Sequence, residues 1–282
     1  MRRIPSARVA VLALLLAAPA AAEPDRAYPW REAVEPAATL AARLPPPPGF
    51  VRPPVPPGSF AAWLRGLPLK PGRPQVMLHD GRAKANQAAH HAVLDIDVGR
   101  RDLQQCADAA IRLRAEYLFA AGRPEAIRFN FTSGHPVPFS RWAKGERPVV
   151  RGNTVSWTRG ARPDGSWASL RRYLDVIFRY AGSHSLSREL APVADPGTVQ
   201  AGDVFVRGGF PGHAVIVVDV AHGPRGARAF LLAQSYMPAQ DPHVLVNPRD
   251  PGLSPWYATG FGATLVTPEW IFASGELRRW RD

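Results

Sequence analysis

The chain has 282 residues, 46% of them hydrophobic and 21% charged, and its formal net charge at pH 7 is +12. A chain of this length can bury a full hydrophobic core and fits one large domain, or one domain with an N-terminal arm. Its basic residues are scattered in ones and twos and are not interleaved with aromatic residues, which argues against nucleic-acid binding. A cationic surface of this kind suits an anionic envelope polymer without pointing to a particular one.

The first 22 residues have the pattern of a secretory signal peptide. Arginines at positions 2, 3 and 8 precede an apolar run that ends in small residues, and this is the order of parts in such signals. The run is shorter than the ~20 residues of a membrane-spanning helix, and no later segment is apolar for that long. We therefore expect a mature protein that begins near Glu23, has no transmembrane segment and is periplasmic or secreted.

Proline dominates the segment that follows. A short helix is predicted over residues 34–44, and residues 44–58 contain eight prolines. Proline fixes φ and lacks an amide donor, which excludes a helix or a central strand here. We expect residues 23–57 to form an N-terminal arm and linker that buries little apolar surface, and residues 58–282 to form the compact domain.

Hydrophobic periodicity predicts the elements of that domain. The clearest helix runs from Asp102, as its cap, to Gly122, with apolar residues at alternating spacings of three and four. Residues 214–220 and 228–234 are joined by a Gly-Pro-Arg-Gly turn and should form an antiparallel hairpin. The other expected elements are helices over 59–69 and 169–180, strands over 91–99, 127–134, 203–208 and 243–247, and a long ordered loop over 136–165.

Cys106 is the single cysteine of the chain. In an oxidising compartment such a residue is either buried and inert or kept as a reactive thiol. It lies in the first turns of the predicted helix, on the apolar side, where a cysteine is usually a core residue. A thiol near a helix N-terminus also feels the positive end of the helix dipole, which lowers its pKa. Both interpretations stay open at this point.

Two strand starts supply a partner for a reactive thiol. GDVFV begins at Gly202, and GHAVIVVD places His213 at the mouth of the next strand. A cysteine near a helix start, a Gly-Asp strand, a Gly-His strand and then a strand with a polar residue resemble, in this order, papain-like hydrolases of the NlpC and CHAP kinds, many of which cut peptide bonds in peptidoglycan. The resemblance implies an α+β papain-like fold, with helices packed on a central antiparallel sheet.

The chain as a whole more closely resembles a bacterial family, the domain-of-unknown-function family 4846. The segments DLQQCADA, GHAVIVVD and LLAQSYMPAQ carry this resemblance, which covers most of the chain after the proline-rich segment. That family brings no established activity with it.

The resemblance to papain-like hydrolases implies a role for each site residue. Cys106 would be the nucleophile, His213 the base that takes its proton, and Gln234 the residue that orients the imidazole from the neighbouring strand. Gln105 or Gln104 would lend an amide donor to the oxyanion. As the third residue, glutamine is weaker than a carboxylate at stabilising the imidazolium.

Other motifs are weaker. Asp219 shares the face of His213 on its strand, but it lies six residues away, about 20 Å along an extended chain. The segment 234–240 is either a substrate-facing loop or a polar turn. No phosphate loop, dinucleotide fingerprint or G-x-S-x-G motif is present. Three groups of neighbouring residues have side chains of the types that bind metal ions: His79 and Asp80, His90 and His91 with Asp95 and Asp97, and Asp241 with His243. Their spacing is not that of a zinc site. We therefore expect neither a metal nor a cofactor.

The leading functional interpretation is an exported cysteine hydrolase, an amidase or peptidase acting on amide bonds of peptidoglycan or another envelope polymer. The alternative is a non-catalytic exported binding module that retains a papain-like cleft. The sequence indicates no oligomeric state.

Overall fold

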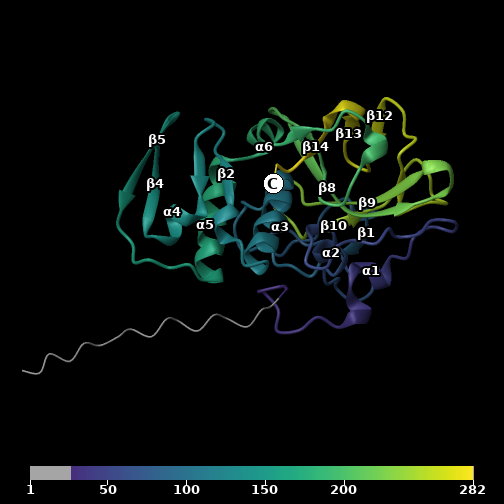
Figure 1. The fold of residues 1–282 in the computed structure, drawn as a ribbon, viewed down its shortest axis with the longest axis horizontal. Helices are drawn as coiled ribbons and strands as arrows, with labels where there is room; N and C mark the ends of the chain where they lie inside the picture. The colour runs from purple at the N-terminus through teal and green to yellow at the C-terminus, as the bar shows by residue number, and fades with distance from the viewer. Residues whose placement is uncertain (1–26, 282) are drawn as a thin grey trace, which may run out of the picture.

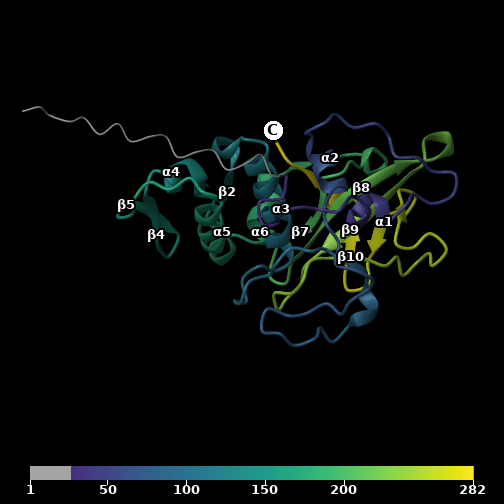
Figure 2. The same ribbon diagram turned by 90° about the horizontal axis from the view of Figure 1, so that it is seen from below.

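The computed structural model describes residues 27–281, and the predicted signal peptide lies outside the described residues. A large sheet forms one side of the molecule, and a smaller group of helices with a β-hairpin forms the other, with helix α3 between them (Figures 1 and 2). The α-helices are α1 Leu40–Arg43, α2 Phe60–Arg65, α3 Cys106–Ala120, α4 Phe139–Ala143, α5 Trp167–Tyr180 and α6 Ser183–Glu189. The strands are β1 His90–Val93, β2 Arg128–Asn130, β3 Pro136–Pro138, β4 Glu146–Arg151, β5 Thr154–Arg159, β6 Ala191–Pro192, β7 Val204–Arg207, β8 His213–His222, β9 Arg228–Gln234, β10 His243–Leu245, β11 Tyr257–Ala258, β12 Thr264–Val266, β13 Ile271–Ala273 and β14 Leu277–Arg279.

The main sheet is antiparallel. Its order is β1-β10-β9-β8-β7-β14-β6, and β11 adds to β9 outside this path. The predicted hairpin is confirmed, because β8 pairs with β9 in antiparallel register from Ile216 opposite Ala233 to His222 opposite Arg228. The protein therefore has the expected α+β architecture of helices combined with a mostly antiparallel sheet.

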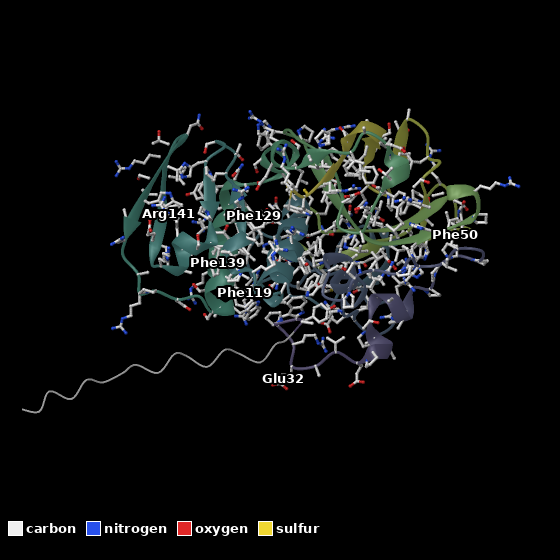
Figure 3. The ribbon with its side chains drawn as sticks, in the orientation of Figure 1. Glu32, Phe50, Phe119, Phe129, Phe139 and Arg141 are labelled. Atoms are coloured by element: carbon white, nitrogen blue, oxygen red, sulfur yellow. The ribbon has the colours of Figure 1, made fainter. Side chains whose placement is uncertain are left out.

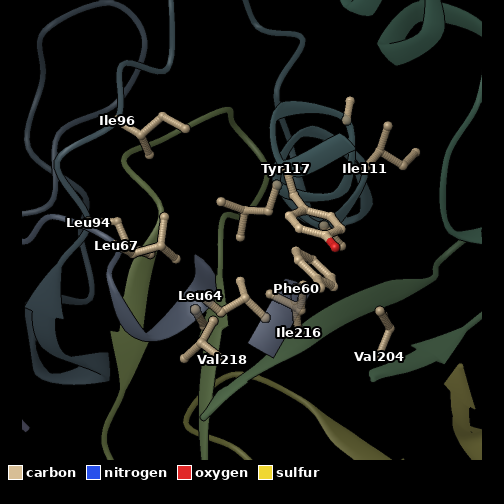
Figure 4. Packing of buried hydrophobic residues seen from close by; sticks show 14 of the residues in the cluster. Phe60, Leu64, Leu67, Leu94, Ile96, Ile111, Tyr117, Val204, Ile216 and Val218 are labelled. Atoms are coloured by element: carbon tan, nitrogen blue, oxygen red, sulfur yellow. The ribbon is translucent and has the colours of Figure 1, made fainter. Parts of the chain in front are cut away.

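Strand β8 is buried on both faces. Alternate residues of a strand point to opposite faces, and the residues of β8 divide accordingly between two hydrophobic clusters. Ala214, Ile216 and Val218 join the cluster that contains α2 and α3, and Figure 4 shows Ile216 near Phe60 and Val218 near Leu64. Val215 and Val217 join the cluster on the other face, with Phe205, Phe230 and Phe272. Helix α3 is thus packed directly on the strand that begins with His213.

Helix α3 begins at Cys106, later than predicted. Gln105 is its N-cap, and the backbone N–H of Gln105 donates to Oδ2 of Asp108 at 3.0 Å, one half of a capping box. Asp102, the expected cap, instead accepts hydrogen bonds from Gln105 Nε2 at 2.9 Å and from the backbone N–H of Ala239 at 2.7 Å. Because Gln105 is the N-cap, Cys106 occupies the first position of the helix.

The N-terminal arm packs on the domain from residue 27 onward. Three of its apolar side chains are buried in the main core, namely Tyr28, Leu40 and Leu44. The backbone of Val51 bonds in both directions with that of His222 at the end of β8, and Arg52 Nε donates to Asp219 at 2.6 Å. The expectation of a linker that buries little apolar surface is wrong, because proline excludes regular structure without preventing its neighbours from packing.

Residues 136–165, expected as a long loop, contain strand β3, helix α4 and the β4–β5 hairpin. Arginine–tryptophan contacts hold this region together: Arg141 stacks over Trp157 at 4.0 Å and Arg147 over Trp142 at 3.8 Å. Figure 3 labels Arg141 and Phe139 in this region, away from the main sheet. The strands β11–β14 were not predicted, because each has only two or three residues and too short an alternation to detect.

Candidate functional site

The Cys106 thiol lies where α3 meets the start of β8. The backbone N–H groups of Ala107, Ala214 and Cys106 itself lie near enough to the thiol to lower its pKa. Ala214 follows His213 along the chain and belongs to the face of β8 that α3 covers. The ring of His213 lies against Phe272, which belongs to the cluster on the other face of the sheet.

Burial dominates the acidity of this thiol. Burial, followed by the nearby Asp108 carboxyl, raises the pKa of Cys106, and the backbone N–H groups lower it by less, so that the pKa is about 11. Asp108 is itself buried, and desolvation raises the pKa of its carboxyl well above its usual value. The dipole effect expected from the sequence is therefore outweighed by desolvation.

His213 opens strand β8 and is only 2% exposed. Its Nε2 atom lies 2.8 Å from Oε1 of Gln234, the last residue of β9. Aromatic rings surround the imidazole, with ring centroids at 4.8 Å for Tyr236, 5.2 Å for Trp270 and 5.9 Å for Phe272. Burial lowers the pKa of His213 to about 4, although the hydrogen bond to Gln234 opposes this shift. The imidazole is neutral at pH 7.

The glycine before His213 has a steric role. A Cβ atom at Gly212 would lie 2.3 Å from Ser183 Oγ and 2.6 Å from the carbonyl oxygen of Gly209. Any larger residue would have to displace the backbone that leads into β8. The Gly-His pair of the sequence is therefore explained by close packing of the chain at the mouth of the sheet.

The Gly-Asp pair has a structural role. Gly202 has φ +97°, and a Cβ there would lie 2.7 Å from the ring of Phe60. Both carboxylate oxygens of Asp203 accept hydrogen bonds from Arg279 of β14, at 2.7 Å each. This pair fastens β14 to the chain entering β7.

Tyr236 is a further neighbour of the imidazole. Burial raises the pKa of its phenol, and Glu269 and Cys106 raise it further. Its ring lies beside that of His213, and Lys84 Nζ lies 5.1 Å from the centroid of the ring. The sequence indicated a polar segment at 234–240, without a role for this residue.

Gln234 lies at the centre of a buried polar network. Its Nε2 atom donates to Oε2 of Glu269 at 2.7 Å and lies 3.4 Å from Nε2 of His243. Lys84 Nζ bonds to both Glu269 oxygens at 2.7 Å, and the side chains of Lys84 and Glu269 are only 5% and 13% exposed. Sequence reasoning missed Lys84 and Glu269, since both lie in irregular segments that carry no motif.

The other predicted residues are placed as follows. Gln105 caps α3, and its side-chain amide donates to Asp102, so its donor serves the helix start. Gln104 is 1% exposed; its Oε1 atom accepts from Arg112 at 2.7 Å, and its Nε2 atom has no hydrogen-bond partner among the described residues. Asp219 is bound by Arg52 and Arg65, at 2.6 and 2.8 Å, and holds the N-terminal arm.

His213 is 2% exposed and Cys106 is half-buried. Cavities of about 300, 310, 350 and 630 Å³ on the described part of the molecule are lined by other residues. Titratable groups with strongly shifted pKa values gather at functional sites, and both the Cys106 thiol and the His213 imidazole have such shifts.

Residues 27–281 contain neither a metal-binding cluster nor a membrane-spanning helix. No group of three or more histidine, cysteine, aspartate or glutamate side chains in this range is arranged to hold a metal ion. No helix in the same range has both the length and the apolar character needed to cross a membrane.

The fold and the site define a class of protein: an α+β protein whose mainly antiparallel sheet buries a histidine bound to a glutamine, with a half-buried cysteine at the start of the helix that covers the sheet. The chain belongs to the family described as domain of unknown function 4846, whose model matches residues 40–279. No curated protein and no solved structure matches the chain. The family match includes the proline-rich segment, in agreement with its packing on the domain.

Proposed function

We propose that the protein is an exported cysteine hydrolase that acts on amide bonds of an envelope substrate, namely peptidoglycan peptides. The observation that carries the proposal is the sulfur of Cys106 at the first position of α3 beside Ala214, with His213 next in the chain and bound to Gln234 at 2.8 Å. The order of these parts along the chain, together with the contact between His213 and Gln234, supports the roles of a nucleophile, a base and an orienting group.

In the proposed reaction, His213 takes the thiol proton of Cys106 as the sulfur attacks the amide carbonyl carbon, and the carbonyl electrons move to oxygen. Backbone N–H groups at the start of α3 stabilise the oxyanion. The tetrahedral intermediate then breaks its C–N bond, and the imidazolium gives its proton to the leaving amine. A water molecule loses a proton to the imidazole, attacks the thioester and releases the acid, and the thiolate recovers the proton.

The substrate class rests on charge and on the N-terminal segment. The chain carries 35 basic and 23 acidic residues, a balance that favours association with the anionic polymers of an envelope. The predicted signal peptide would deliver the protein there.

The test is release of new amino termini from purified peptidoglycan by the mature protein. We expect release by the wild type and none by Cys106→Ala, while Cys106→Ala and the wild type show the same circular dichroism. Equal release by both proteins would contradict the proposal, because the nucleophile would then be another group.

A second candidate function is a non-catalytic binding module, and one observation favours it. Proton transfer from a thiol with a pKa of about 11 to an imidazole with a pKa of about 4 costs about 10 kcal/mol before the attraction between the two new charges is counted. A neutral Cys106 thiol and a neutral His213 imidazole suit a binding site that retains the packing of a papain-like cleft and lacks the catalytic reaction. Tight binding of peptidoglycan fragments with no release by either protein would establish this function instead.

A further inference from the structure

We propose that Glu269, held by Lys84, is a positioning residue that fixes the tautomer of His213 through Gln234, so that Nδ1 is the basic nitrogen of the ring. The consequence for catalysis rests on the proposed function, whereas the tautomer itself is a property of the folded chain.

The first step is the contact between Glu269 and Gln234. The Lys84 ammonium bonds to both oxygens of Glu269 at 2.7 Å, and a carboxylate in such an ion pair only accepts hydrogen bonds. The atom of Gln234 that faces Glu269 at 2.7 Å must therefore be the amide nitrogen. This contact excludes the flipped orientation of the side chain, in which two oxygens would meet.

The second step is His243 on β10. Its Nδ1 atom lies 2.8 Å from the carbonyl oxygen of Asp241, and since a carbonyl only accepts, Nδ1 carries the proton. Burial lowers the pKa of His243 to about 3, so the ring is neutral and its Nε2 atom is bare. That atom lies 3.4 Å from Gln234 Nε2 and accepts its second hydrogen.

The third step is the orientation of His213. Both amide hydrogens of Gln234 are directed at Glu269 and His243, so the oxygen of Gln234 faces His213 Nε2 at 2.8 Å. An oxygen without hydrogens only accepts, so Nε2 of the neutral His213 ring carries the proton. Nδ1 is left with its lone pair, and it makes no hydrogen bond to any residue that the structure describes.

The network also acts electrostatically. The Glu269 carboxylate, one hydrogen bond beyond Gln234, polarises the Gln234 amide, whereas the Lys84 ammonium lowers the pKa of His213. Lys84, which is almost fully buried, keeps that carboxylate in place. Glu269 therefore acts on His213 through Gln234 and touches neither the sulfur nor the substrate.

The experiment is nitrogen NMR of the imidazole rings in the ¹⁵N-labelled mature protein at pH 7, with His213→Gln used to assign the signals. We expect wild-type His213 to show a protonated Nε2 and a bare Nδ1. Glu269→Gln allows the Gln234 amide to flip, so the two nitrogen shifts of His213 should converge as the tautomers mix. Glu269→Asp keeps a carboxylate and should restore the single tautomer.

The matched control is Glu146→Gln, the same chemical change at a carboxylate that pairs with Arg141 on the distant hairpin; it should leave the His213 signals unchanged. A protonated Nδ1 in the wild type, or an unchanged tautomer in Glu269→Gln, overturns the inference. If Glu269→Gln does not fold, the wild-type spectrum decides alone. If the wild-type protein hydrolyses peptidoglycan peptides, Glu269→Gln should lower kcat of that reaction by about 10–100-fold with little change in KM. A tautomer switch in a protein without activity would support the inference and contradict the hydrolase.

Discussion

The backbone N–H of Ala214, the residue that follows His213, lies near enough to Cys106 to lower the pKa of its thiol. This proximity joins the first turn of α3 to the first residues of β8. The loss of water around the sulfur raises the pKa and has the larger effect, so it outweighs what the backbone N–H groups offer to a thiolate.

The first prediction concerns the reactivity of this thiol. Because its pKa is about 11, the thiolate fraction at pH 6.5 is about 100-fold below that of free cysteine. We expect Cys106 to react with iodoacetamide at least that much more slowly than free cysteine, and to regain the ordinary rate in denaturant. Labelling of Cys106 faster than free cysteine at pH 6.5 would contradict a raised pKa of this thiol.

The second prediction concerns stability in acid. Burial lowers the pKa of His213 from 6.5 to about 4, so the unfolded chain binds a proton below pH 6.5 that the folded protein does not. The stabilisation that the neutral ring contributes is complete above pH 6.5 and is lost progressively down to about pH 4, by about 3 kcal/mol.

Urea unfolding between pH 4 and pH 8 measures this loss. His213→Gln should make the fall in unfolding free energy between pH 6.5 and pH 4 shallower, with the remaining fall due to His243, whose pKa is also lowered by burial, and the two curves should run parallel above pH 7. Parallel curves over the whole range would show that the ring is not held neutral by burial.

The third prediction concerns the N-terminal arm. Leu40 is 0% exposed, so Leu40→Ala should lower the free energy of unfolding by about 2–5 kcal/mol through lost burial and the cavity left behind. Val51 lies in the same arm but is 68% exposed, so Val51→Ala should change stability by less than about 0.5 kcal/mol. Deletion of residues 23–57 should lower the melting temperature strongly, and an unchanged value would mean that the arm does not contribute to the core in solution.

The fourth prediction concerns the glycine that precedes His213. A methyl group at Gly212 would meet Ser183 Oγ at 2.3 Å, so Gly212→Ala should cost about 1–3 kcal/mol of stability and shift the NMR signals of His213. Nothing lies within 4 Å of a Cβ at Gly275, which makes Gly275→Ala the matched control. Equal stability of the two variants would show that the chain relaxes at Gly212 without cost.

Local pattern was enough to predict several elements. The β8–β9 hairpin followed from two apolar runs around a glycine-proline turn, and α5 followed from its apolar spacing. The start of α3 was misplaced, because Asp102 is a good cap by residue type but is bound by Gln105 and Ala239. Which of two capping residues is used depends on a contact from a distant segment.

Some residues of the candidate site could be predicted from the sequence and others could not. The order of the motifs picked out Cys106, His213 and Gln234, and the structure places Gln234 against His213 as expected. Lys84 and Glu269 could not be found, since a buried ion pair between two irregular segments leaves no periodic or spaced signal.

The sequence by itself determined the antiparallel hairpin at the centre of the sheet and the residue types able to form a cysteine–histidine pair, because turn chemistry and hydrophobic alternation act between near neighbours. Only the tertiary structure decided the protonation of that pair and the role of the arm. Both depend on burial: desolvation of Cys106 and His213 comes from segments remote in sequence, and Leu40 and Leu44 are buried by contacts that proline spacing does not encode.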